Sequence, residues 1–431
     1  MLSSIELPST RTEAEPVRAP LSNLLAAYRA GDSLFASPLG SRLGQGVACA
    51  LGADAASAGA PAQADGRAQA AARLTRRASA LLQHAQDTLG IAEPVLMGAV
   101  PFDVRQPARL VVPRTLLLGE AAQAELLASD DAAARPPATA PRNVCPEPVP
   151  EAYEAAVTDA LARFARGELD KVVLARTLRV ALQAAPDRAA LLRRLAARNT
   201  RGYTYAVALQ DAAQAAAEGL AEPAAFIGAT PELLVRRFGN RVVVNPLAGS
   251  AARSADPERN EAIGAALLRS PKDRHEHALV IDAVAQALRP LCRTLDVPAA
   301  PELVATDALW HLSTTLVGEL ADPATTSLDL ALALHPTPAV CGFPADQAFA
   351  AIDALESFDR GFFAGFVGWC DAKGDGEWAV ALRCAELRGT AVRLYAGAGI
   401  VAGSVPASEA LETGTKFRTM LSALGLGSAL D

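Results

Sequence analysis

Apolar residues from residue 151 onwards recur at two different spacings. In residues 151–164 they recur at helical spacing, and KDRHEHALVIDAVAQAL further on predicts a second helix. Short β-type runs lie around these helices, among them KVVLART, AAFIGAT, LLVRRF and RVVV. Gly239-Asn240 predicts a hairpin between the last two, and Arg388-Gly389 predicts another between WAVALRCAEL and TAVRLYA. Hairpins with helices between them favour a large α+β fold with antiparallel sheet.

Two stretches, residues 52–72 and 128–150, interrupt this pattern because they contain few large apolar residues. Residues 128–150 hold six prolines and predict a surface connection. We therefore divide the chain into an N-terminal portion of the fold (1–127), a Pro/Ala-rich connection (128–150) and a longer C-terminal portion (151–431). Ala-rich segments at 52–72 and 208–224 read as insertions, and no internal repeat is present.

Composition narrows the classes of protein to consider. The chain has 431 residues, 51% of them hydrophobic, which is enough for a large core. A net charge of −7 without a basic run argues against nucleic acid as a partner. No apolar run is long enough to span a membrane, and the N-terminus lacks a secretory signal, so we expect a cytoplasmic protein. The six cysteines form no CxxC pair and suggest neither disulfides nor structural zinc.

The segment VRLYAGAGIVAGSVPASEALETGTKFRTML combines glycines with charged groups. A strand is expected to lead through a glycine-rich loop into a helix, with Glu409, Glu412 and Lys416 on one helical face. Backbone N–H groups at Gly397 and Gly399 would be unobstructed. Two carboxylates and a lysine beside such a loop suit a divalent cation that holds an anion, and the alternative is an ordinary solvated helix face.

Two further residues have the chemistry of proton-transfer groups. Lys171 opens the apolar strand KVVLART, where partial burial favours the neutral amine and hence a general base. It could equally be a strand-end lysine that reaches into water. Glu232 follows Thr230 and Pro231 in ATPELL, a pattern that also fits the first turn of a short helix.

The helix KDRHEHALVIDAVAQAL places Asp273 and Glu276 on a shared face by their spacing of three. A zinc motif HExxH is excluded because Leu279 stands where the second histidine is required. A carboxylate site for Mg²⁺, formed by Glu276 and Glu412, fits better. Whether Asp273 and Glu409 also contact the metal stays open.

Other segments offer groups that suit a small anion. In WAVALRC, Arg383 is expected to share a strand face with small alanines, which leaves room for a carboxylate above it. Gly249 and Ser250 in PLAGSAAR offer a backbone and hydroxyl contact, or simply a turn. GAGIVAG has the spacing GxGxxxG after a hairpin strand, so a nicotinamide enzyme is not indicated. Cys341 has no partnered histidine in its motif and is not read as a nucleophile.

Taken together, these segments resemble the chorismate-utilising enzymes, and among them the isochorismate synthases. The resemblance covers roughly residues 150–428 and rests on ordered blocks: DKVVLAR, GATPELL, PLAGSAAR, KDRHEHALV, LWHLSTTLVG, LHPTPAVCGFP, ESFDRGFFAGFVGWCD, GEWAVALRCA, YAGAGIV and ETGTK. DSLFASPLGSR resembles the family more weakly. The resemblance implies two antiparallel β-sheets packed together with helices outside, and a dependence on Mg²⁺.

The resemblance also implies roles for particular residues. Lys171 would be the base that activates water, and Glu232 the acid that protonates the departing hydroxyl. Glu276 and Glu412 would hold Mg²⁺ against the ring carboxylate of chorismate. The implied substrate contacts are Gly249, Ser250, Ala339, Arg383, Gly397 and Lys416.

Within the family, the sequence favours an isochorismate synthase, which is an isomerase. Synthases that take ammonia from an amidotransferase usually show AGTRPRG where this chain has AGSAARS, so no amidotransferase subunit is expected, and we expect a monomer. Salicylate synthases, the main alternative, tend to have threonine in place of Ala339. A non-catalytic anion-binding relative is disfavoured because Lys171 and Glu232 are both present. Siderophore and menaquinone synthesis both remain open as pathways.

Overall fold

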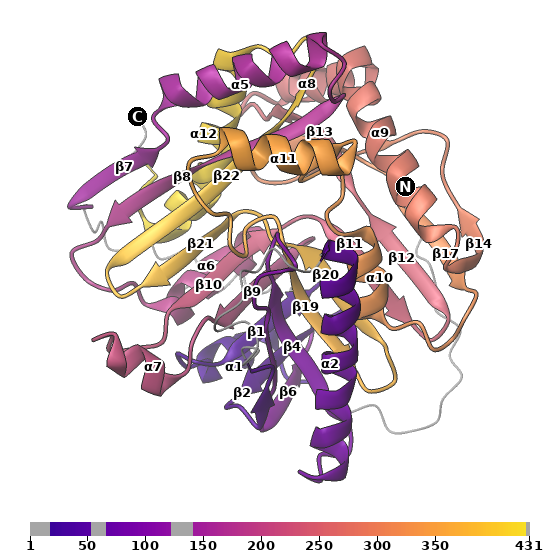
Figure 1. Cartoon of the computed structure of the whole chain (residues 1–431). Coiled ribbons are helices and arrows are strands. Elements are labelled where there is room, and N and C mark those ends of the chain that lie inside the picture. Colours follow the sequence, from indigo (N-terminus) through magenta and orange to yellow (C-terminus); the bar gives the residue numbers. More distant parts are fainter. Residues whose placement is uncertain (1–17, 53–65, 122–140, 428–431) are drawn as a thin grey trace.

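The computed structural model describes residues 18–52, 66–121 and 141–427. Within these ranges, twenty-two strands form two large antiparallel sheets and one small one, with helices packed around them (Figure 1). This confirms the α+β class with two antiparallel sheets. No helix in the described ranges is long and apolar enough to cross a membrane.

The first sheet has ten strands in the order β18-β8-β22-β21-β10-β9-β1-β2-β6, with β7 also paired to β8. Strands from the first 120 residues therefore lie in the same sheet as strands from residues 151–431 and pair directly with them. The bounds are β1 (Ser33–Ser37), β2 (Gly40–Gln45), β6 (Thr115–Gly119), β7 (Asn143–Glu147), β8 (Lys171–Ala181), β9 (Tyr203–Ala208), β10 (Ala225–Thr230), β18 (Gly342–Phe343), β21 (Cys384–Arg388) and β22 (Ala391–Val401).

The second sheet has nine strands in the order β14-β17-β12-β11-β20-β19-β4-β5-β3. Its bounds are β3 (Cys49–Ala50), β4 (Val95–Val100), β5 (Arg109–Val112), β11 (Leu233–Phe238), β12 (Arg241–Asn245), β14 (Cys292–Asp296), β17 (Leu316–Leu320), β19 (Phe366–Asp371) and β20 (Gly376–Val380). A third sheet of three strands joins β13 (Leu247–Ala252), β16 (Leu309–Ser313) and β15 (Glu302–Ala305).

Helices cover the outer faces of the sheets. Figure 1 shows α5, α11 and α12 around β8 and β22, and α9 and α10 beside the strands of the second sheet. The bounds are α1 (Leu21–Ala27), α2 (Arg67–Asp87), α5 (Pro150–Ala165), α6 (Arg188–Arg198), α7 (Ala212–Ala217), α8 (Pro257–Arg269), α9 (Pro271–Leu288), α10 (Ser327–Leu334), α11 (Ala345–Leu355) and α12 (Pro406–Leu424).

One apolar core lies between the two large sheets, and a second lies between the ten-stranded sheet and helices α1, α6 and α12. Phe226 and Tyr205 contribute to the first core from the ten-stranded sheet, and Trp378 and Phe366 contribute from the other. All four are at least 98% buried. Burial of such large apolar side chains is the main favourable contribution to folding. The ten-stranded sheet is thus covered on both faces, which explains its continuous apolar runs.

Several expectations are confirmed and two need correction. The hairpin at Gly239-Asn240 joins β11 to β12, and the second hairpin joins β21 to β22. WAVALRCAEL, however, is not one strand, because its first half is β20 in the nine-stranded sheet and its second half is β21 in the ten-stranded sheet. AGAGIV is not a loop either: it lies inside β22, which pairs with β8 over eleven residues, from Lys171 opposite Val401 to Ala181 opposite Ala391.

The regions expected to be irregular also hold regular structure. Strand β7 lies within the connection 128–150, and helix α7 lies within the Ala-rich segment 208–224. Residues 53–65 and 122–140 lie outside the described residues, so most of the segment 52–72 is not described.

Candidate active site

A cavity of about 250 Å³ lies where β8 and β22, the small sheet, α9 and α12 meet. Five carboxylates and three cationic side chains line it, which makes it strongly charged for a site between packed sheets. Buried charges are retained where they are paired or where they bind a ligand. The charged lining residues are Glu232, Lys272, Asp273, Glu276, Arg383, Glu409, Glu412 and Lys416.

Lys171 lies behind one wall of this cavity. Its side chain is fully buried, and its Nζ is 2.8 Å from Oε1 of Glu276 on α9. Glu276 faces the cavity, whereas Lys171 is not among the lining residues. A Cβ atom built on Gly399 would clash with that same Oε1, so a side chain there would push the Glu276 carboxylate away from its present position. The expected exposed strand-end lysine is therefore excluded.

Glu232 occupies the connection between β10 and β11, and its carboxylate lines the cavity. It is not part of a helical turn, which corrects the capping alternative. Its side chain accepts a long hydrogen bond of 3.5 Å from the backbone N–H of Leu247. Burial raises the pKa of Glu232 to about 7, although that hydrogen bond and the charge of Lys171 oppose the rise. The carboxyl group can therefore hold a proton near neutral pH.

The charged face of α12 turns inward to the cavity and is only partly exposed. The Glu412 carboxylate accepts a hydrogen bond of 3.0 Å from the Ser250 hydroxyl and lies 2.6 Å from Nζ of Lys416. Lys416 also donates a 2.7 Å hydrogen bond to the carbonyl of Gly397. Burial alone would raise the pKa of Glu412, but Lys416 and Ser250 outweigh it and lower that pKa. Glu412 therefore remains ionised.

Ser250 reaches Glu412 because β13 is irregular at this point. The pairing of β13 with β16 shifts register between Leu247 and Ser250, and Gly249 between them has a φ of +79°. That conformation is costly for residues with a Cβ atom. The local bulge brings both residues to the cavity wall, so the expected turn is a strand with a bulge.

Arg383 lies in the short link between β20 and β21 and not within a strand, which corrects the expected alternation with its alanine neighbours. Its φ is +48°, an uncommon value for a residue with a side chain. Burial lowers the pKa of Arg383 to about 10, with Glu412 and Glu232 opposing the fall. The guanidinium stays protonated at neutral pH and can bind a carboxylate through paired hydrogen bonds.

The carboxylates are suited to hold a divalent cation. Burial raises the pKa values of Asp273 and Glu409, and repulsion from Glu412 adds to the rise in both. Glu409 lies 3.2 Å from Nζ of Lys272. In the described part of the chain, no three His, Cys, Asp or Glu side chains are already grouped as a metal site. Carboxylate oxygens are the donors that Mg²⁺ prefers, and it commonly takes only one or two of them besides substrate and water.

The remaining predicted residues also reach the cavity. Ala339 lines it from the connection after α10, and Gly397 lines it from β22. The structure therefore brings nine of the ten predicted site residues to one cavity wall or another, with Lys171 directly behind Glu276.

Sequence reasoning missed His311 on β16. Its side chain lines the cavity, it is 6% exposed, and its Nε2 has no hydrogen-bond partner among the described residues. Burial and the charges of Arg383 and Lys416 hold the pKa of His311 well below its usual value. The block LWHLSTT contained the only signal, because alternation sets Trp310 and His311 on opposite faces without saying which face meets the cavity.

Comparison with known proteins gives consistent matches. A family model described as chorismate binding enzyme matches residues 113–425. Isochorismate synthase DhbC of Bacillus subtilis is 46% identical over 417 residues, which are 97% of this chain and 98% of that protein. The vibriobactin-specific isochorismate synthase of Vibrio cholerae is 42% identical over 82% of this chain and 85% of its own length. The crystal structure of DhbC from Bacillus anthracis, described as 2,3-dihydroxybenzoate-specific, superimposes with a TM-score of 0.83 at 42% identity, covering 94% of this chain and 99% of that one.

The raised pKa of Glu232 makes a prediction about stability. A carboxyl group with an ordinary pKa of 4.5 and a folded-state pKa of about 7 binds its proton more tightly in the folded protein. Its contribution to stability is therefore fully present below about pH 4.5 and is lost as the pH rises through about 7. Glu232→Gln removes this titration. From pH 5 to pH 8, the free energy of unfolding of the variant should therefore rise relative to that of the wild type by about 3 kcal/mol at most.

Urea unfolding at both pH values measures this difference. Glu261→Gln, an exposed glutamate on α8, is the matched control and should follow the wild type. A Glu232→Gln variant that loses stability with pH as steeply as the wild type would show that this carboxyl group is already ionised at pH 5.

Proposed function

The chain belongs to the family of chorismate-binding enzymes, and we propose that the cavity described above is the site where it converts chorismate to isochorismate. It is an isochorismate synthase, like the relatives above 40% identity that span most of its length. The observation that carries the assignment of the site is the pairing of two proton-transfer groups, Lys171 and Glu232, with cationic anchors around a single cavity.

The reaction adds water at C2 of the ring while hydroxide departs from C4, so one group must take a proton and another must supply one. Glu232 is suited to supply it, because its raised pKa lets the carboxyl group hold a proton near neutral pH. Lys171 is suited to take the proton from water, because its amine lies directly behind Glu276 at the cavity wall. The two groups come from separate elements, β8 and the connection between β10 and β11.

The cationic and hydroxyl groups that line the cavity would orient the substrate. Arg383 and Lys416 can bind the carboxylates of chorismate, and Gly249, Ser250 and Gly397 offer polar contacts nearby. Because these groups come from β13, β22, α12 and the link before β21, the ring would be held from several sides. Such fixation supplies much of the rate of an enzymatic reaction by orienting the reacting atoms.

Glu276 and Glu412 are the residues that would hold Mg²⁺. A bound Mg²⁺ would fix a ring carboxylate and polarise the ring. Glu276 contacts Lys171 in this structure, so the same carboxylate would lie between the metal and the proposed base. Glu412 is already held ionised by Lys416, as a metal ligand must be.

The relatives named for 2,3-dihydroxybenzoate and vibriobactin favour siderophore synthesis over menaquinone synthesis as the pathway. The cytoplasmic location, the monomeric state and the absence of an amidotransferase subunit stay predictions. Salicylate synthase is the second candidate, and Ala339 argues against it because an alanine at the cavity wall leaves space beside the ring.

Purified protein with chorismate and Mg²⁺ tests the proposal through the products, which should be isochorismate with little pyruvate. Lys171→Ala and Glu232→Gln should each lower kcat by about two to four orders of magnitude, since each removes one proton-transfer group. Lys373→Ala, an exposed lysine, should leave activity unchanged. Circular dichroism and Tm verify the fold, which matters for Lys171→Ala because it leaves Glu276 without its partner. Either variant retaining more than about a tenth of wild-type kcat would refute the role of that residue.

The metal site predicts a change in the Mg²⁺ requirement. Glu276→Gln and Glu412→Gln should each raise the Mg²⁺ concentration for half-maximal activity, because each deletes a charged oxygen ligand. Glu261→Gln is the control and should behave as the wild type. EDTA should stop the wild-type enzyme reversibly, and full activity in EDTA would rule out the magnesium site.

The choice between the two candidate functions depends on Ala339. The wild type should release little pyruvate, whereas Ala339→Thr should release measurable pyruvate because the larger side chain shifts the ring towards elimination. Ala339→Val has the shape of threonine without the hydroxyl and separates the two effects. Lactate dehydrogenase coupling reports pyruvate directly. Stoichiometric pyruvate from the wild type would identify a salicylate synthase.

A further inference from the structure

Strand β8 has a gap on one edge, two residues beyond Lys171. On that edge β18 pairs with residues 171–172, and β7 pairs only from residue 177 onwards. The N–H of Val173 is satisfied by the Cys341 carbonyl at 2.7 Å. The carbonyl of Val173 and the N–H of Ala175 face this gap, and unpaired buried backbone groups are costly.

Two charged side chains fill the gap in place of a strand. Arg360 donates a 2.7 Å hydrogen bond through Nη2 to the Val173 carbonyl, and the Glu356 carboxylate accepts one of 2.7 Å from the N–H of Ala175. Arg360 and Glu356 also pair with each other, with Nε donating to Oε2 at 2.8 Å. Both side chains are 3% exposed. Each charge is thus fully compensated in the interior, which buried charges require.

The same guanidinium also reaches the segment beside β8 that continues the cavity wall. Nη1 of Arg360 donates a 2.8 Å hydrogen bond to the carbonyl of Val340, the residue after Ala339. Val340, Ala339 and Val173 all line the catalytic cavity, whereas Arg360 and Glu356 do not. Arg360 therefore joins the strand that carries Lys171 to the segment that forms the wall beside the ring.

We propose that Arg360, held by Glu356, is a positioning residue that sets the distance between the Lys171 strand and the Ala339–Val340 wall. The inference rests on the proposed function. Guanidinium geometry is required, because hydrogen bonds leave in three directions from one rigid plane, whereas a lysine offers a single ammonium. The ring of Phe102, 4.5 Å from Cζ of Arg360, packs against the guanidinium and restricts its position further.

The position of Arg360 predicts which step suffers when it is lost. The groups proposed to bind the substrate carboxylates, Arg383 and Lys416, lie on elements that Arg360 does not hydrogen-bond. Substrate affinity should therefore change little. Pyruvate elimination starts from isochorismate that has already formed, so it does not compete with water addition. A displaced Lys171 strand should slow water addition and lower kcat, whereas a displaced Ala339–Val340 wall should let bound isochorismate reach the pose that eliminates pyruvate and so raise the share of pyruvate.

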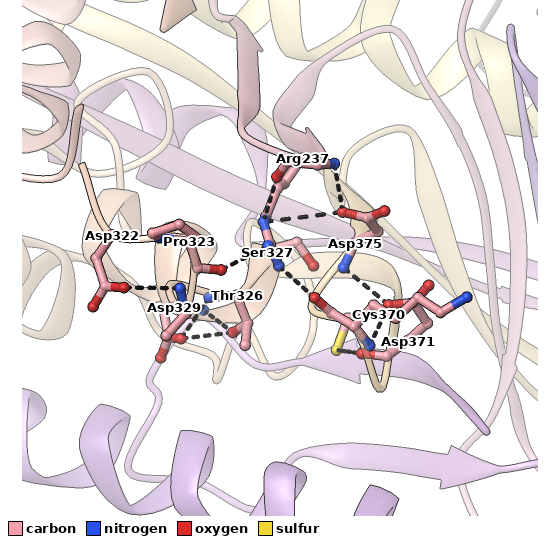
Figure 2. A network of polar contacts seen from close by, with 12 residues as sticks. Arg237, Asp322, Pro323, Thr326, Ser327, Asp329, Cys370, Asp371 and Asp375 are labelled. Atoms are coloured by element: carbon pink, nitrogen blue, oxygen red, sulfur yellow. Dashed lines mark hydrogen bonds and ion pairs between the residues drawn. The ribbon is translucent and has the colours of Figure 1, made fainter. Parts of the chain in front are cut away.

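Arg237 is a matched control, and Figure 2 shows the network of polar contacts around it. This arginine is also almost fully buried and also joins separate segments, since it donates to the carbonyls of Gly239, Lys373 and Pro323 at 2.8–3.0 Å. It does not line the catalytic cavity. Its replacement should cost stability, as that of Arg360 should, but it leaves both walls of the cavity in place.

The experiment compares Arg360→Met, Arg360→Lys, Glu356→Gln and Arg237→Met by Tm, kcat per folded protein, KM, and the ratio of pyruvate to isochorismate. We expect Arg360→Met to lower kcat by about 10- to 100-fold with KM within about threefold, in line with a displacement of about 1 Å. The pyruvate share should rise several-fold. Arg360→Lys and Glu356→Gln should show smaller changes in the same direction, and they carry the test if Arg360→Met does not fold. The ratio of products does not depend on how much protein is folded.

A product ratio and kcat per folded protein equal to those of the wild type in the Arg360 and Glu356 variants would overturn the inference. An equal change in Arg237→Met would overturn it as well, because general destabilisation would then explain both. Failure of the proposed function is a separate outcome, since it would appear as a wild-type enzyme that makes no isochorismate.

Discussion

The contact between Lys171 and Glu276 is the interaction on which the site depends, because a fully buried ammonium is tolerated only with a compensating charge. Three elements must converge to make it: β8 carries the lysine, α9 carries the glutamate, and β22 must pass close by at Gly399. The eleven-residue pairing of β8 with β22 fixes two of these, and α9 is brought against the small sheet by its own apolar face. Removing either charge would leave the other buried and unpaired, at a cost of about 3–5 kcal/mol.

The same constraint shapes the rest of the cavity. Lys416 holds Glu412 in its ionised form, and Lys272 lies against Glu409, so two carboxylates of the wall each have a lysine partner. Lys171 compensates Glu276 from behind the wall. Glu232 differs from Glu276, Glu409 and Glu412 because no lysine or arginine forms an ion pair with it in the described structure, and burial dominates its pKa. One cavity thus contains a protonatable acid beside ionised ligands, which is how carboxylates acquire separate roles.

Much of this arrangement could be predicted from sequence, and the exceptions have physical reasons. The residue types of the proposed acid, base and metal ligands indicate their chemistry, and the family resemblance implied that they share one site. These residues are Lys171, Glu232, Glu276 and Glu412. Local periodicity could not show that WAVALRCAEL divides into two strands, β20 and β21, that belong to different sheets. His311 was missed because its orientation depends on how the small sheet packs. Arg360 was missed because its partners are mostly backbone carbonyls, which leave no pattern in the sequence.

The segment that runs from β20 to β21, and so from one large sheet to the other, also explains where backbone strain is found. Among the described residues, Ala364 and Arg383 are the non-glycine positions with positive φ, and both line the cavity. Ala364 is tied to the crossing segment by hydrogen bonding its N–H to the carbonyl of Ala381, and the carbonyl of Arg383 accepts from the N–H of Ala229. These bonds hold conformations that cost about 1–3 kcal/mol each. An unstrained continuation of β20 would keep Arg383 in the nine-stranded sheet. The link between β20 and β21 allows consecutive residues to join both large sheets. It also places the Arg383 guanidinium where the sheets meet, and there the substrate carboxylate is proposed to bind.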